Sequence, residues 1–180
     1  MAQVYAGAGG RLPENRAQMF HAFVDTLLER EEKRHPDEWI GFQRQKEALS
    51  TLAYAMKMER GRGTTVERAW AEDRLRRAMP GCDPRGMLYL TSSATLTDLD
   101  ESSVRFYHQL LQEYFAAREM GRRAAAGGSL MRYWSPDRWW EPSGWEETAI
   151  LMIGMEENAT ALLEKVAGVN PIVSARYLLE

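Results

Sequence analysis

The sequence predicts a mainly α-helical protein with one small β-hairpin. Apolar residues recur at spacings of three and four in most segments, which is the period of one helix face. A single pair of short, alternating segments flanks a polar turn, which indicates a hairpin. The composition, 44% hydrophobic and 27% charged, is that of a soluble globular protein. The 180 residues suffice for one domain with a proper core, or for one domain and part of another.

Three helices are predicted in the first half of the chain. The first opens at Leu12-Pro13 and stops before Pro36, because the residue that precedes a proline disfavours the helical conformation. The second covers residues 39–59 and is broken by the run RGRG. The third follows TTVE, which predicts a capping box in which Thr64 caps the helix and Glu67 lies three residues on.

The predicted hairpin lies directly before a long helix. A turn at PGCDP and a short helix over 88–94 lead into TLTDL and VRFYH, which flank the polar turn DESS. After His108 the period of apolar residues changes from two to 3.6, so this histidine lies at the junction of strand and helix. Helices followed by a short hairpin are the outline of a winged-helix domain, and many other small α+β domains share this outline. We expect a winged-helix-like domain flanked by helical segments.

An aromatic segment separates this region from the last helices. The run GRRAAAGGS (121–129) predicts a flexible break, and YWSPDRWWEPSGW follows it with four of the six tryptophans. We expect these tryptophans to pack on the preceding domain, since buried aromatic rings dominate core and interface energetics; a platform for stacking sugars is the alternative. Ser143 with Glu146 predicts a second capping box. Gly168 is the expected stop of the next helix, and a last helix starts at Asn170-Pro171.

Several classes of protein are disfavoured by the composition. Cys82 is the only cysteine, so no intrachain disulfide and no multi-cysteine zinc site can form. His21, His35 and His108 are too scattered to predict a metal site. The longest apolar run, AILMIGM, is far shorter than the roughly 20 residues that span a bilayer. The amino-terminal residues lack the pattern of a secretory signal. We therefore expect a cytoplasmic protein without membrane contacts.

The charge is unevenly distributed along the chain. The net charge is −3, with five Arg and two acidic residues in 105–134, and three basic and eight acidic residues in 135–180. This pattern fits contacts between neighbouring domains, and equally a solvated surface of no special purpose. The basic side chains that a DNA-binding winged helix could use are Arg105, Arg118, Arg122 and Arg123. The acidic balance, and the lack of a basic helix with base-reading Asn or Gln, disfavour nucleic acid as a partner.

Four segments carry a resemblance to a known family. They are LPENRAQMFHAFVDTLLERE, VRFYHQLLQEYFAARE, RWWEPSGWEETAILMIGM and NPIVSARYLLE, and together they span nearly the whole chain. In this order they resemble segments of bacterial NACHT-type NTPases, which are signal-transduction ATPases related to NOD-like receptors. The most specific pattern comprises Phe106, His108, Gln112, Glu113, Tyr114, Phe115, Ala116 and Ala117.

The resemblance implies a division of the chain and a set of partners. Residues 1–35 would be the end of the helical domain beside the ATPase core, 36–125 the winged-helix domain, and 130–180 the start of a helical, HEAT-like repeat region. His108 would reach the phosphate of ADP bound by the core, and would thereby hold the closed, inactive state. The implied partners are the upstream NACHT ATPase core, the downstream helical repeats and further copies that assemble in the active state.

The chain departs from the family in one decisive respect. It contains no G-x-x-x-x-G-K-[ST] and no acidic run after a hydrophobic strand, so the phosphate-binding loop and the Mg²⁺ site are missing. We therefore expect no catalysis and no cofactor in the isolated chain, and assign ADP/ATP with Mg²⁺ to a parent protein. The resemblance also leads us to expect that the chain stops inside a larger protein and that Met1 need not be its native start.

Two questions stay open at the level of sequence. His108 is either a core histidine with a satisfied hydrogen bond or a contact for an anionic ligand, for which a helix start is suited. In the second case, replacing it by alanine should leave the stability of this chain nearly unchanged. Apart from DNA binding, the other functional alternative is a helical-repeat scaffold without a nucleotide role, and that alternative predicts no hairpin before His108.

Overall fold

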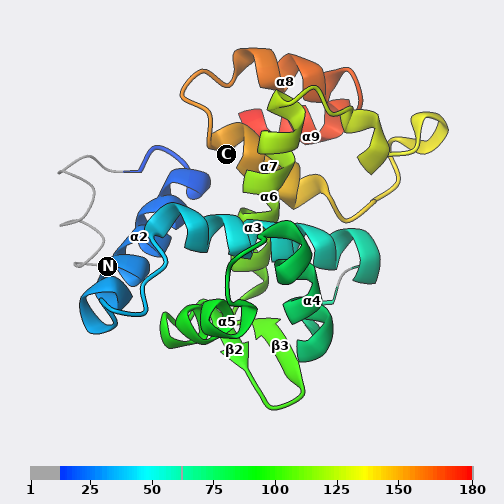
Figure 1. Ribbon diagram of the computed structural model, residues 1–180. Coiled ribbons are helices and arrows are strands. Elements are labelled where there is room, and N and C mark those ends of the chain that lie inside the picture. The colour runs from blue at the N-terminus through cyan, green and yellow to red at the C-terminus, as the bar shows by residue number, and fades with distance from the viewer. Residues whose placement is uncertain (1–12, 62, 180) are drawn as a thin grey trace.

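Helices build most of the protein. The computed structural model describes residues 13–61 and 63–179 (Figure 1). In chain order the elements are α2 (Arg16–Arg34), α3 (Phe42–Arg60), β1 (Thr65–Glu67), α4 (Arg68–Ala78), α5 (Pro84–Ser93), β2 (Thr97–Leu99), β3 (Ser103–Phe106), α6 (Gln109–Ala125), the short 3-10 helices η1 (Leu130–Tyr133) and η2 (Pro136–Arg138), α7 (Glu146–Gly154), α8 (Thr160–Ala167) and α9 (Pro171–Leu178). The mainly helical prediction is confirmed.

The strands form a small antiparallel sheet with the order β1-β3-β2. Strands β2 and β3 are the predicted hairpin, in which Thr97 lies opposite Phe106 and Leu99 opposite Val104. Strand β1 pairs with the other edge of β3, with Val66 opposite Val104. The predicted hairpin is confirmed. The alternative of a helical-repeat scaffold, which predicted no hairpin before His108, is wrong on this point.

The predicted capping box at Thr64 is wrong. Residues 65–67 form β1, and α4 begins one residue later with Glu67 at its N-cap and no side-chain cap. A three-residue strand has no stability alone and forms here because β3, nearly 40 residues later, supplies its partner. Local sequence patterns contain no information about such a distant pairing.

Other helix ends differ from the predictions in ways that the caps explain. Helix α2 starts at Arg16, because the Asn15 side chain accepts a hydrogen bond from the Gln18 N–H; the predicted start at Leu12 lies outside the described residues. Part of the predicted PGCDP turn belongs to α5, where Asp83 is the N-cap. Helix α6 runs through Gly121 to Ala125, so the predicted break begins later than expected. The predicted stop at Gly168 and start at Asn170-Pro171 are confirmed.

The core lies around α3 and α6. Helix α3 crosses the middle of the molecule, with α5 and the hairpin below it and α7, α8 and α9 above it (Figure 1). Helix α6 packs on both α3 and α7. Helix α7 is buried from Thr148 to Gly154, which explains its continuous apolar sequence. Within the described residues, no helix is both long and apolar enough to cross a bilayer.

Helices α2 and α7 approach each other closely at Gly154. The Asn15 side chain donates a hydrogen bond to the Gly154 carbonyl at 3.0 Å. A Cβ at position 154 would lie 3.1 Å from the Ala17 Cβ and 3.2 Å from Asn15 Oδ1. Contacts this short are tighter than normal packing, so a side chain at residue 154 would require Ala17 and Asn15 to move away by a few tenths of an ångström.

Candidate functional site

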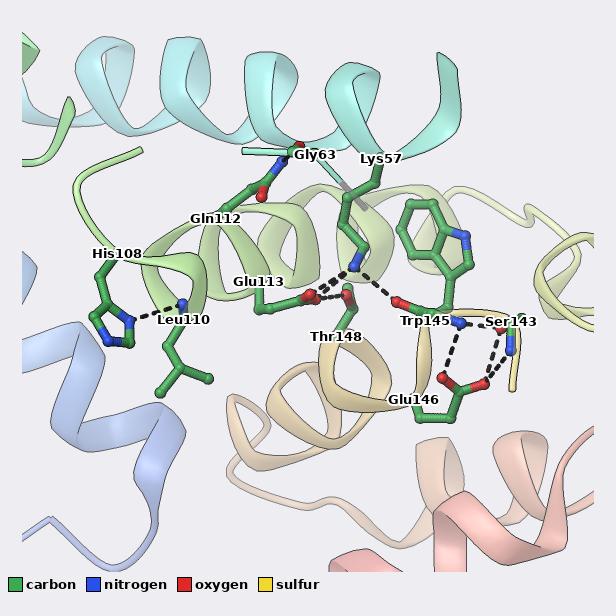
Figure 2. Close-up of polar contacts among 11 residues, drawn as sticks. Lys57, Gly63, His108, Leu110, Gln112, Glu113, Ser143, Trp145, Glu146 and Thr148 are labelled. Carbon is green, nitrogen blue, oxygen red and sulfur yellow. Dashed lines mark hydrogen bonds and ion pairs between the residues drawn. The ribbon is translucent and has the colours of Figure 1, made fainter. Parts of the chain in front are cut away.

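His108 lies at the N-cap of α6, immediately after β3. Its Nδ1 atom accepts a hydrogen bond of 3.1 Å from the Leu110 N–H (Figure 2). Because Nδ1 is the acceptor, the neutral ring carries its remaining proton on Nε2. Among the residues that the structure describes, Nε2 has no hydrogen-bond partner. The imidazole therefore closes the helix end with one nitrogen and offers a donor to solvent with the other.

The alternative that His108 is a core histidine is wrong, because the residue is exposed. The prediction that it lies at the junction of strand and helix is confirmed. We expected that replacing His108 by alanine would leave the stability nearly unchanged. The ring does have a local partner, because it accepts a hydrogen bond from the Leu110 N–H. Loss of an N-cap acceptor typically costs about 0.5–2 kcal/mol, so removing the imidazole should have a small but measurable effect.

The rest of the Phe-x-His-x-x-x-Gln-Glu-Tyr-Phe-Ala-Ala pattern faces inward. Tyr114 and Phe115 are fully buried. Gln112 donates a hydrogen bond of 3.1 Å to the carbonyl of Gly63, which joins α6 to the loop before β1. Glu113 enters a buried ion pair. The pattern thus combines one exposed residue, His108, with a set that holds α6 in place.

Glu113 and Lys57 form the centre of a buried polar cluster (Figure 2). The Lys57 ammonium lies 2.7 Å from both carboxylate oxygens of Glu113 and donates a further bond of 2.8 Å to the Gly144 carbonyl. The Thr148 hydroxyl also donates to Glu113. The ammonium lies 5.1 Å from the centre of a Trp145 ring. The cluster therefore connects α3, α6, the start of α7 and the end of the aromatic segment.

No sequence pattern predicted this cluster. Lys57 and Glu113 are 56 residues apart, and each resembles an ordinary exposed helix residue when read locally. One signal was present in the sequence. Glu113 stands among apolar and aromatic residues that turn out to be buried, and a carboxylate is rarely buried without a partner. Buried charges of this kind are paired, and breaking the pair is costly.

The aromatic segment, residues 133–145, is only partly packed. Trp134 and Trp145 are buried, and Trp145 stacks against Tyr54 of α3 with ring centres 5.4 Å apart. Trp140 is 56% exposed. The expected packing of all four tryptophans thus holds for two of them. One half of the predicted capping box is present, because Glu146 accepts a hydrogen bond of 2.7 Å from the Ser143 N–H. The N-cap of α7, however, is Trp145 and not Ser143.

A second polar network joins α2, α3 and α6. His21 Nδ1 lies 3.0 Å from the Tyr114 hydroxyl, and its Nε2 lies 3.4 Å from Asp25. Asp25 also forms an ion pair with Lys46. Burial raises the pKa of Tyr114 to about 12, so the hydroxyl stays protonated well above neutral pH. Burial also lowers the pKa of His21 from 6.5, and the charges of Lys46 and Arg118 lower it further, against an opposing effect of Asp25.

The lowered pKa of His21 predicts a dependence of stability on pH. Below the ordinary pKa of 6.5 the unfolded chain binds more protons at this site than the folded chain does. The free energy of unfolding should therefore decrease as the pH falls from about 7 to about 5, before the carboxylates titrate. Urea unfolding of wild type and His21→Gln across this range tests the prediction.

The His21→Gln variant should show a flatter dependence on pH than the wild type. Tyr89→Phe, at an exposed tyrosine of α5, is the control and should keep the wild-type slope, because it leaves all the histidines intact. Equal slopes in wild type and His21→Gln would contradict the assignment of the effect to His21.

The described residues contain no group of three or more His, Cys, Asp or Glu side chains placed to hold a metal ion. No protein-family model matches the chain, and a search of curated proteins finds no match either.

Proposed function

We propose that the chain is a regulatory segment of a NACHT-type signalling ATPase, and that its winged-helix domain senses the nucleotide state of an upstream ATPase core. In this proposal the ADP-bound, inactive state is held by a contact between His108 and a phosphate group of the nucleotide. Exchange of ADP for ATP releases that contact. The observation that carries the proposal is the exposed imidazole of His108 at the amino-terminal end of α6.

The order of elements supports a winged-helix assignment. Helix α3, strand β1, helices α4 and α5 and the β2–β3 hairpin follow one another, with β3 central in the sheet. A winged-helix domain has this order, with the turn of the hairpin as its wing. The turn here lies at 100–102, and α6 follows the hairpin directly.

The chemistry at the start of α6 suits a phosphate. The helix has 17 residues, and its dipole favours negative charge near its amino-terminal end. The Nε2 proton of His108 is a donor with no other partner among the described residues. A phosphate presented by another domain could therefore bind here without rearrangement of β3 or α6.

DNA binding has less support from the corresponding surfaces. Helix α5 would be the recognition helix, and Arg85 is its only basic residue. The Arg85 side chain forms an ion pair with Glu72 of α4. The turn of the hairpin carries Asp100 and Glu101, which would repel phosphate groups. No specific observation therefore favours this function over the nucleotide-sensing one.

Nucleotide retention in the longer protein tests the proposal. His108→Asn is the informative variant, because asparagine is a good N-cap but has no imidazole. The longer protein, with the upstream core, is purified without added nucleotide, and its bound ADP is measured by chromatography after denaturation. We expect His108→Asn to retain several-fold less ADP than wild type, and His35→Asn, the control, to retain the wild-type amount. Equal ADP in His108→Asn and wild type would refute the contact.

The stability of the present chain provides a separate check on His108. We expect His108→Ala to lower the free energy of unfolding by about 0.5–1 kcal/mol, because only the bond to the Leu110 N–H is lost. His108→Asn should restore most of this loss. A loss of more than about 2 kcal/mol in urea unfolding would mark the ring as a structural residue and weaken its proposed role as a ligand contact.

Catalysis belongs to the upstream core in this proposal. The chain alone should not hydrolyse ATP, because its sequence lacks the phosphate-binding loop. A coupled phosphate-release assay on repurified protein checks this expectation, with the longer protein as the positive control. Hydrolysis that stays proportional to the concentration of the present chain through two purification steps would contradict it.

A further inference from the structure

The segment between α6 and α7 has a glycine in an unusual conformation near each end. Gly127 has φ of +87° and Gly144 has φ of +89°, values that residues with a side chain rarely adopt. We refer to residues 127–144 as the strap. A segment bounded by such residues can swing about both ends, because glycine crosses between backbone regions at little cost.

Three polar contacts fasten the strap to α3 and α9, beside the hydrogen bonds that Glu146, at the start of α7, accepts from Trp134, Ser143 and Gly144. The Tyr133 hydroxyl lies 2.8 Å from the Tyr54 hydroxyl of α3. The Gly144 carbonyl accepts the bond from Lys57, also of α3. Near the middle, the Trp139 carbonyl accepts a bond of 3.0 Å from the Asn170 side chain at the start of α9. The strap thus spans from α3 to α9 across the start of α7.

The strap is packed unequally along its length. Leu130, Tyr133 and Trp134 are buried, whereas residues 135–138 and 140–143 are exposed. A segment with few buried side chains and exposed backbone has a low free energy of local opening. The three buried side chains make the closed position the ground state, and the exposed half adds little to hold it there.

The hydrogen bond from Lys57 to the strap can break and form again without leaving a buried charge unpaired. When the strap leaves, water can reach the Lys57 ammonium and the Glu113 carboxylate, so the two charges regain hydration while they stay paired. Opening breaks the bond from the Trp134 indole to Glu146 and the ring contact of Tyr133 with Trp145. Trp145 and α7 themselves stay in place, because α7 is packed against α6 through its own buried residues. Opening then exposes Tyr54 and Lys57 of α3.

We propose that the strap is a hinged element, held closed against α3 by its contacts with Lys57 and Tyr54, and that it opens as a unit while the remaining fold stays intact. We call these two contacts the latch. The latch is a conformational device of this chain and does not depend on the proposed contact between His108 and a nucleotide.

Hydrogen exchange on the full 180-residue chain tests the latch. The variants are Lys57→Met, which removes the ammonium, and Tyr133→Phe, which removes one hydroxyl of the buried pair. Tyr89→Phe is the control, because Tyr89 is an exposed tyrosine on α5. Exchange is followed by mass spectrometry in peptides from the strap and from the hairpin, and trypsin cleavage at Arg132 and Arg138 is measured in parallel.

We expect strap amides to exchange about ten-fold faster or more in both test variants, which corresponds to about 1.4 kcal/mol of lost closing free energy. Hairpin amides, such as that of Tyr107, which bonds to the Leu96 carbonyl, should keep their wild-type rates. Trypsin should cut the strap faster in the same two variants, and Tyr89→Phe should match wild type.

Equal acceleration of strap and hairpin amides would overturn the proposal, because it would show that the strap opens only when the whole chain unfolds. Unchanged strap exchange in Lys57→Met and Tyr133→Phe would overturn it as well, since the two residues would then not act as the latch. If Lys57→Met fails to fold, the unpaired Glu113 carboxylate accounts for it, and Tyr133→Phe alone then decides the proposal by the same two criteria.

Discussion

Replacing Phe115 by alanine is expected to lower the free energy of unfolding by about 3–5 kcal/mol. Phe115 is fully buried in α6, and its ring lies 6.0 Å from that of Phe106 in β3 and 5.2 Å from that of Tyr114. The alanine variant loses the transfer free energy of the ring and leaves a cavity between α6 and the sheet. Urea denaturation followed by circular dichroism measures the loss.

Two comparisons separate cavity formation from a general sensitivity of α6. Phe115→Met keeps most of the volume and should lose less than about 1.5 kcal/mol. Leu110→Ala, at a half-buried position of the same helix, should lose clearly less than Phe115→Ala. If Phe115→Ala and Leu110→Ala cost the same, the ring would not contribute to the core as the structure indicates.

The second large effect is expected at the close approach of α2 and α7. Gly154→Val should lower the free energy of unfolding by about 2–3 kcal/mol, in the upper part of the range for overpacking. Its Cβ alone would lie 3.1 Å from that of Ala17, and the branched side chain adds two further methyl groups. Helix α2 must shift, and the hydrogen bond from Asn15 to the carbonyl of residue 154 is then strained or lost. Urea unfolding gives the loss, and hydrogen exchange in α2 locates it.

Gly121→Ala is the matched control for this prediction. Its Cβ would meet only the Met152 Cγ, at an ordinary distance of 3.4 Å, and the position lies inside α6. Alanine is favoured over glycine in a helix by about 0.8–1 kcal/mol, so this variant should be slightly more stable than wild type. A Gly154→Val variant as stable as wild type would contradict the close packing of the two helices.

The proposed function depends on one exposed side chain, whereas most of the pattern around it serves the fold. Tyr114 and Phe115 fill the core, and Glu113 pairs with Lys57. Changes at these positions should act on stability or on the position of the strap. Among the residues of this pattern, only His108 combines exposure with a free donor, and its replacement by asparagine is therefore the cleanest test of nucleotide sensing.

The sequence alone determined the features that depend on neighbours within a few residues. The hairpin followed from alternation around a polar turn, and the position of His108 followed from the change of period after it. The start of α9 followed from Asn170-Pro171, because cap geometry is a local property. The resemblance to NACHT-type proteins also came from sequence, and the function drawn from it remains a proposal.

Only the tertiary structure decided the features that join distant segments. Strand β1 exists because β3 pairs with it, although its residues locally resemble a helix start. Lys57 and Glu113 meet because α3 and α6 pack together. Trp145 is buried where it packs against Tyr54 and Tyr133, whereas Trp140 of the same segment stays exposed. The physical reason is common to these cases. Hydrogen-bond pairing between strands, ion pairing and burial depend on which surfaces meet in space, and the local periodicity of a chain does not encode that meeting.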